Sequence, residues 1–244
     1  SSSSLLLDKN NNNNNVDHTN AFVIGASSLE NELSLSSSSS SNTKKKKKKI
    51  LVPIGDGSEE IETTCITDTL TRFGAEVILA SVMSTSRNEQ EQLVCKMRGG
   101  IKIVADMSID DAAEQEWDLI VLPGGMPGAT NLRDSPTLST LLQKQKQDGK
   151  KYAAICASPA VVLAAQGLID NNTDDGGGGV TCNPAPQFRH MMTNPVNDLV
   201  AVTQHGQLTT SQGPGTAILF ALELGEQLYG KEIRDKIEKE MIVA

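Results

Sequence analysis

A cysteine between two apolar segments is the residue of this chain whose type and position are best suited to chemistry. Residues 153–155 are small and apolar, as expected of a buried strand, and Pro159 opens a second apolar segment in the manner of a helix start. Cys156 would lie on the turn between them, where a side chain is forced out of the path of the backbone. The positive end of the following helix favours a thiolate, and backbone N–H groups there can bind an anion. Cys156 is therefore a candidate nucleophile, and the alternative is an inert buried cysteine.

The segments around Cys156 predict a parallel sheet covered by helices. From residue 50 onward, short continuous apolar runs alternate with helical segments, a pattern typical of an α/β fold. Strands are expected at residues 50–54, 76–81, 118–122 and 153–155, with a hairpin of residues 199–203 and 207–210. Helices are expected at residues 59–73, 108–114, 136–147, 159–166, 217–229 and 231–240.

In such a sheet the functional site lies beyond the carboxyl ends of the strands. Three loops would meet there: the loop leading into residues 59–62, the loop containing Gly124 and Gly125, and the turn at Cys156. Ser58 is expected to cap the first helix. Residues 88–96 are expected to form a polar loop in which Cys95 is exposed and oxidisable.

Charge and cysteine content disfavour several classes of function. The chain of 244 residues has a net charge of −8; residues 1–49 carry +3, so the remainder carries −11. An acidic body argues against broad binding to nucleic-acid phosphates, which needs a basic surface. The four cysteines are widely spaced, with neither a CxxC pair nor a Cys/His cluster, which favours reduced thiols. No apolar run reaches membrane-spanning length. We expect a soluble intracellular protein without a membrane partner, a metal or a cofactor.

Residues 1–49 differ in composition from the rest and are expected to form a disordered, low-complexity leader. They contain homopolymeric runs at residues 1–4 and 36–41 (Ser), 10–15 (Asn) and 44–49 (Lys). Such a segment buries too little apolar surface to offset the entropy of ordering it. We interpret it as a solvated tether of a cytoplasmic protein; the alternative is the remnant of a targeting segment for a plastid or another organelle. Residues 50–244 are expected to form one domain with a glycine-rich insertion at residues 171–179.

Four short motifs follow one another along residues 50–244, and together they resemble the ThiJ/PfpI superfamily. They are Glu59-Glu60-Ile61-Glu62-Thr63, Val121-Leu122-Pro123-Gly124-Gly125, Ala154-Ile155-Cys156-Ala157 with Pro159, and Ser211-Gln212-Gly213-Pro214-Gly215-Thr216. Within the superfamily, the chain is most similar to the parkinsonism-associated deglycase (DJ-one) branch. The resemblance implies a flavodoxin-like, three-layer α/β sandwich of the class I glutamine amidotransferase type, with a mostly parallel sheet. It also implies a homodimer.

The resemblance further implies roles for individual residues. Cys156 matches the reactive cysteine of the family, and Glu62 matches its partner carboxyl on the first helix. Arg72 and Arg98 fall near positions where relatives hold basic residues beside the pocket and the dimer interface, so they are candidate anion-binding residues. Oxyanion donors and substrate-binding residues are expected at Gly124, Gly125, Ala157, Asn183, Gly213 and Pro214.

One position departs from the family pattern. Asn183 stands where relatives often carry a histidine; its amide can donate a hydrogen bond but cannot act as a general base. His190 is a candidate substitute, although an ordinary loop histidine is the simpler interpretation. Protease-like members place a histidine directly after the cysteine, where this chain has Ala157. Glutamine amidotransferases pair a downstream histidine with an acid, and His205 has no acidic neighbour in the sequence.

These residues predict addition of a thiolate to an activated aldehyde. A carboxyl beside a thiolate resists ionisation because adjacent negative charges repel, so Glu62 would be partly protonated and could shuttle a proton. With methylglyoxal, a small reactive dicarbonyl, the expected reaction is a glutathione-independent, glyoxalase III-type conversion to lactate. The resemblance implies the same activity, together with protein deglycation. The alternative is a redox sensor or redox-regulated chaperone that uses Cys156, because an accessible thiolate is readily oxidised.

Overall fold

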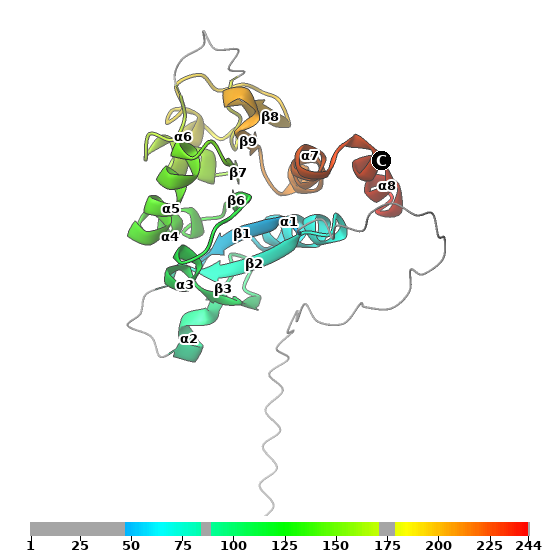
Figure 1. Cartoon of the computed structure of the whole chain (residues 1–244). Helices are drawn as coiled ribbons and strands as arrows, with labels where there is room; N and C mark the ends of the chain where they lie inside the picture. The colour runs from blue at the N-terminus through cyan, green and yellow to red at the C-terminus, as the bar shows by residue number, and fades with distance from the viewer. Residues whose placement is uncertain (1–46, 84–88, 171–178, 244) are drawn as a thin grey trace, which may run out of the picture.

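A seven-stranded sheet forms the centre of the molecule (Figure 1). The computed structural model describes residues 47–83, 89–170 and 179–243, so residues 1–46 of the expected leader and residues 171–178 of the expected insertion lie outside it. Neighbouring strands are parallel except for β8 and β9, which are antiparallel. In spatial order the strands are β5 (Met107–Ser108), β2 (Glu76–Ser81), β1 (Lys49–Ile54), β6 (Leu119–Leu122), β7 (Lys151–Ile155), β9 (Leu208–Ser211) and β8 (Val200–Thr203).

Helices cover both faces of this sheet, which explains the continuous apolar sequences of the central strands. Every residue of β6 is buried, as are the last five residues of β1 and the last four of β7. On one face α1 (Glu60–Arg72) packs on α7 (Ala217–Tyr229), and α8 (Lys231–Glu240) packs on α7 (Figure 1). The other face carries α3 (Ile109–Ala113), α4 (Gly128–Arg133), α5 (Pro136–Gln147) and the π-helical turn η1 (Pro159–Ala164). The predicted three-layer α/β sandwich is confirmed.

Several elements have the bounds that local sequence signals predict. The strand β2 and the helices α5, α7 and α8 begin and end where expected. Pro136 occupies the first turn of α5 after the capping Ser135, whose hydroxyl accepts a hydrogen bond from Leu138 N. Gly230, with φ +92°, separates α7 from α8. Proline at the start and glycine at the end of a helix are strong local signals because each matches a backbone requirement. The predicted hairpin of β8 and β9 is also confirmed.

Residues 88–96 do not form the expected polar loop. Residues Glu89–Leu93 form the short helix α2, and β3 (Val94–Lys96) pairs antiparallel with β4 (Lys102–Val104). Cys95 is fully buried, with its Sγ 3.5 Å from Ser81 Oγ, so the expectation that it is exposed is wrong. A three-residue strand is too short for an alternating pattern to reveal which of its side chains point inward.

The start of α1 also differs from the expectation. The capping residue is Glu59, whose carboxylate accepts a hydrogen bond from Glu62 N at 2.8 Å. Ser58 lies one residue before the cap, and its hydroxyl accepts a hydrogen bond from Gly55 N at 3.0 Å, which closes the preceding turn. The helix ends at Phe73 and Gly74, as expected. Within the described residues, no helix is both long and apolar enough to cross a membrane.

Candidate active site

Cys156 lies on a sharp turn between β7 and η1. Its φ is +64°, in the left-handed region that few residues other than glycine adopt. Two backbone hydrogen bonds hold it there: Cys156 N donates to Ser211 O at 3.0 Å, and Cys156 O accepts from Asn183 N at 2.8 Å. The side chain is 8% exposed. The turn therefore presents the sulfur at the carboxyl edge of the sheet, where the sequence predicts it.

Gly124 and Gly125, which follow β6, lie against this turn. A Cβ on Gly124 would be 2.6 Å from the Cβ of Cys156 and 2.9 Å from Ile155 O, so only glycine permits this approach. Gly125 has φ +87°, and its N–H donates to the Cys156 sulfur. A Cβ on Gly125 would be 2.4 Å from Gly57 O. The two glycines bring three loops into one site, as the sequence predicts.

Glu62, in the first turn of α1, interacts with the Cys156 thiol and is fully buried. Its Oε2 accepts a hydrogen bond from Gly124 N at 2.7 Å. Its Oε1 has no hydrogen-bond partner among the described residues, and the carboxyl group as a whole interacts with the Cys156 thiol. Burial raises the pKa of Glu62 to about 7; the Gly124 N–H opposes this rise, and the nearby Glu59 carboxylate adds to it. The pKa is shifted in the predicted direction, but the predicted cause is wrong, because burial raises this pKa whereas the interaction with Cys156 lowers it.

The thiol of Cys156 differs from the expectation. Burial raises its pKa to about 11, and the facing Glu62 carboxylate adds to the rise; hydrogen bonds from Asn183 and Gly125 oppose it. The expectation that the helix end favours a resting thiolate is therefore wrong, because burial and a neighbouring negative charge outweigh the backbone donors. The pKa values of Glu62 and Cys156 are about 7 and about 11, so the two side chains together carry one negative charge between about pH 7 and about pH 11. Glu62 holds that charge at rest.

The structure brings most of the other predicted site residues to the same place. Asn183 Nδ2 lies 3.4 Å from Cys156 Sγ. Gly213, after β9, leaves the space beside the sulfur open, because a Cβ there would lie 3.9 Å from Sγ. Pro214 begins the 3-10 turn η3 (Pro214–Thr216) that leads into α7. Ala157 follows the cysteine and is buried.

The two predicted basic residues are placed differently from one another. Arg72 is in the last turn of α1, ten residues or about 15 Å along the helix from Glu62, and its Nε pairs with Asp68 at 2.8 Å. The structure does not bring Arg72 to the site. Arg98 is exposed on the turn between β3 and β4, its N donates to Ser58 O at 2.9 Å, and its charge lowers the pKa of Glu62. His190 is exposed at the end of α6 (Pro186–Arg189).

Two further residues support the site and were not singled out by the sequence. Glu59 is buried; it caps α1 with its carboxylate, and its N donates to Gly124 O at 3.0 Å. Ser158 Oγ donates to Pro123 O at 2.6 Å and so ties the cysteine turn to the glycine loop. The only sequence signal for Glu59 is its place at the start of a helix, and Ser158 carries none, because its hydrogen bond joins loops that are far apart in sequence.

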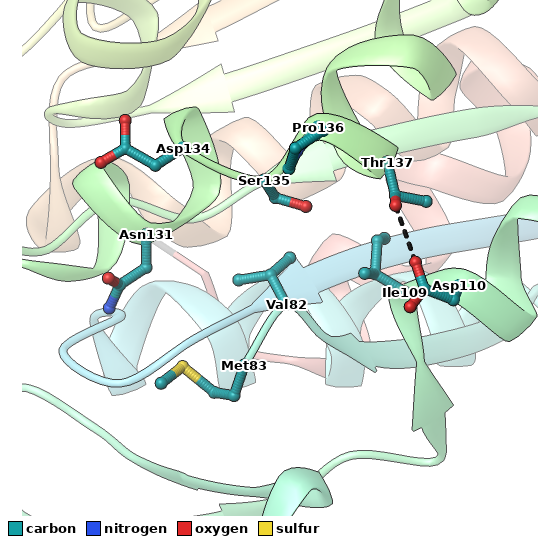
Figure 2. Close-up of a pocket in the computed structure, with 9 residues that line it drawn as sticks. All are labelled: Val82, Met83, Ile109, Asp110, Asn131, Asp134, Ser135, Pro136 and Thr137. Carbon is teal, nitrogen blue, oxygen red and sulfur yellow. Dashed lines mark hydrogen bonds between the residues drawn. The ribbon is translucent and has the colours of Figure 1, made fainter. Parts of the chain in front are cut away.

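A separate cavity of about 380 Å³ lies between the end of β2 and the starts of α3 and α5 (Figure 2). None of the predicted site residues lines it. Figure 2 shows the hydrogen bond across its rim, from Thr137 Oγ1 to Asp110 at 2.7 Å. Its wall touches the loop before α1, because Asn131 Nδ2 donates to Asp56 O at 2.8 Å. The predicted nucleophile Cys156 and its partner Glu62 lie outside this cavity.

A cysteine on a strand-to-helix turn, with a buried carboxyl beside it at the carboxyl edge of a covered parallel sheet, defines a class of α/β protein with a cysteine-centred site. Residues 48–227 match the model of the DJ-1/PfpI family, and the chain belongs to this family. It is 38% identical to "Protein DJ-1 homolog B" of Arabidopsis thaliana over 80% of this chain and 41% of that protein. It is 33% identical to "Glutathione-independent glyoxalase DJR-1.2" of Caenorhabditis elegans over 80% of this chain and 95% of that protein.

A solved structure shows the same fold. The structure titled "Toxoplasma gondii DJ-1, oxidized" has a TM-score of 0.70 and 40% sequence identity, and covers 80% of this chain and 98% of that one. The matched region spans less than half the length of two Arabidopsis relatives, DJ-1 homologs A and B.

Proposed function

We propose that the protein is a glutathione-independent glyoxalase that converts methylglyoxal to lactate, with Cys156 as nucleophile and Glu62 as general base and acid. One observation carries the proposal: the buried Glu62 carboxyl lies between the Gly124 N–H and the Cys156 thiol. The Caenorhabditis elegans relative, which is named a glutathione-independent glyoxalase, supports the same activity. Deglycation of early glycated amines would use the same addition to a carbonyl carbon.

The raised thiol pKa indicates how the reaction begins. Because Glu62 holds the negative charge at rest, its carboxylate takes the thiol proton as the sulfur attacks the aldehyde carbon. A C–S bond forms as the C=O π bond breaks, and Glu62 passes the thiol proton to the aldehyde oxygen, which becomes the hydroxyl of a hemithioacetal. Backbone N–H groups of Gly125 and Ala157 would bind the developing oxyanion. A fixed donor of this kind typically stabilises the transition state by about 3 kcal/mol.

The remaining steps move one proton between two carbons and one between two oxygens. Glu62 removes the proton from the former aldehyde carbon while the ketone oxygen takes up a proton, which gives an enediol. Glu62 then returns its proton to the neighbouring carbon while the hydroxyl on the sulfur-bearing carbon loses its own, which gives a thioester. Water then cleaves the thioester, which releases lactate and regenerates the thiol. The balance is methylglyoxal plus water to lactate, so no external oxidant or reductant is consumed.

The test is turnover of methylglyoxal without glutathione by the full chain, beside the variants Cys156→Ser and Glu62→Gln. We expect both variants to lose at least a hundredfold in kcat/KM. Arg72→Ala is a matched control, because Arg72 lies at the far end of α1. Full turnover by Cys156→Ser would refute the proposal.

The same pair of residues gives the second candidate function, a redox sensor or redox-regulated chaperone. The Glu62 carboxyl, whose Oε1 has no hydrogen-bond partner among the described residues, could donate a hydrogen bond to an oxidised sulfur oxygen when it is protonated. The raised pKa of Cys156 argues against rapid oxidation, because peroxide attacks the thiolate. A parent protein without turnover, whose Cys156 is nevertheless oxidised rapidly, would favour the sensor.

We also propose that the protein forms a homodimer. Ile61 on α1 and Ile101 on the β3–β4 turn are each about half exposed, at 52% and 51%. A hydrogen bond from Gly99 N to Glu60 at 2.8 Å joins the turn that carries Ile101 to the helix that carries Ile61. Burying such side chains is favourable on association. Light scattering of the parent and of Ile61→Lys tests this: the parent should be dimeric and the variant monomeric.

A further inference from the structure

The side-chain amide of Asn183 has one orientation that satisfies both of its neighbours. Its Oδ1 accepts a hydrogen bond from Ala185 N at 3.0 Å, and its Nδ2 lies 3.4 Å from Cys156 Sγ. Rotating the amide would place its NH₂ group against the Ala185 N–H, so that two donors would face each other. The bond to Ala185 therefore directs an N–H of Asn183 toward the sulfur.

Asn183 is also bonded to the cysteine through the main chain, since Asn183 N donates to Cys156 O at 2.8 Å. Among the described residues, Glu62 is the charged side chain that acts on Cys156. The amide donor carries no charge and does not titrate. It favours the thiolate over the thiol at every pH, because a donated hydrogen bond stabilises the charged form.

We propose that Asn183 is a positioning residue whose side-chain NH₂ group makes two separate hydrogen bonds. This proposal rests on the proposed function. One N–H holds the Cys156 sulfur, and the second is available to an oxygen of the substrate beside it. Gly213 keeps that space open, because a Cβ there would lie 3.9 Å from Sγ and 4.0 Å from Nδ2. A 1,2-dicarbonyl has an oxygen on the carbon next to the one attacked, whereas a simple aldehyde has none. The geometry thus favours 1,2-dicarbonyls over simple aldehydes.

Thiol reactivity tests the first of these hydrogen bonds without requiring turnover. The rate of alkylation of Cys156 by iodoacetamide is followed at pH 8 by mass spectrometry of its peptide in the parent, Asn183→Ala and Asn183→Asp. Asn183→Asp keeps an acceptor for Ala185 N–H but places an oxygen and a charge against the sulfur. A hydrogen bond to a charged group corresponds to about a tenfold effect. We expect alkylation to slow about tenfold in Asn183→Ala and further in Asn183→Asp.

A merely structural role would give a different result. If Asn183 serves only to close the turn with Ala185, Asn183→Asp would be alkylated at the parent rate, and that outcome overturns the proposal. Parent-rate alkylation of Asn183→Ala would overturn it too. If the parent shows no methylglyoxal turnover while both variants are slowed as expected, the positioning role stands and the glyoxalase proposal fails.

Protection of Cys156 from alkylation tests the second hydrogen bond. Methylglyoxal and propanal both add reversibly to thiols, and each adduct blocks iodoacetamide. The concentration of methylglyoxal that half-protects Cys156 should be higher in Asn183→Ala than in the parent. This increase should exceed the corresponding increase for propanal by about tenfold. Equal changes for the two aldehydes would refute a contact between Asn183 and the second oxygen.

Discussion

Replacing Glu62 by glutamine should make the protein more stable at neutral and alkaline pH. The carboxyl has a pKa of about 7 in the folded protein, against an ordinary glutamate value of 4.5. Between these two pH values the unfolded chain releases a proton that the folded chain retains, so the free energy of unfolding falls as the pH rises. A difference of about 2.5 in pKa corresponds to about 3 kcal/mol at 1.36 kcal/mol per unit. Glutamine keeps an acceptor for Gly124 N–H and has no charge to bury.

Urea denaturation of the parent and Glu62→Gln from pH 4 to pH 8 measures this effect. Near pH 4 both forms are neutral at this position, and their free energies of unfolding should agree within about 0.5 kcal/mol. At pH 8 the variant should be more stable by about 3 kcal/mol. Glu116→Gln is the matched control, because its side chain is 82% exposed and should give no comparable rise. A difference between parent and Glu62→Gln that stays constant over this range would refute the assignment of Glu62 as a buried carboxyl with a raised pKa.

Three further predictions concern turnover of methylglyoxal. In a pH–rate profile, kcat/KM should fall about tenfold per pH unit below about pH 7, because protonated Glu62 cannot take the thiol proton. The variant Glu62→Gln should not show this pH dependence. Gly124→Ala should reduce kcat more than tenfold and lower the melting temperature, because the added Cβ would meet Cys156 Cβ at 2.6 Å; a parent-like kcat would contradict this. Arg98→Ala should move the acidic limb to higher pH, because the Arg98 charge lowers the pKa of Glu62, whereas Arg72→Ala should leave the profile unchanged.

The parts of the fold that the sequence predicts are those with local causes. Helix α5 is marked by Pro136 at its first turn, and α7 by Gly230 at its end, so neither needs knowledge of distant residues. The central strands are recognisable because burial on both faces requires an unbroken apolar run. The three-residue strand β3 has no such signature, and the burial of Cys95 depends on Ser81 and Ile54 in other strands.

The same distinction applies to the site. The turn at Cys156 and the glycines that approach it follow from strand, turn and helix signals in short segments. The protonation of the pair does not, because it depends on how deeply the tertiary structure buries Glu62 and Cys156. Similarly, residue 183 is identifiable as an amide in the sequence, but the direction of that amide is set by Ala185 N–H in the folded loop.

The left-handed backbone of Cys156 has a consequence for substitution at this position. A residue with a Cβ in this conformation costs about 1 to 2 kcal/mol, which glycine would avoid. Glycine would also remove a side chain that is buried in the core, and the loss of that packing opposes the backbone gain. Backbone conformation alone therefore does not favour cysteine at this turn, and the sulfur is held there against a backbone preference for glycine.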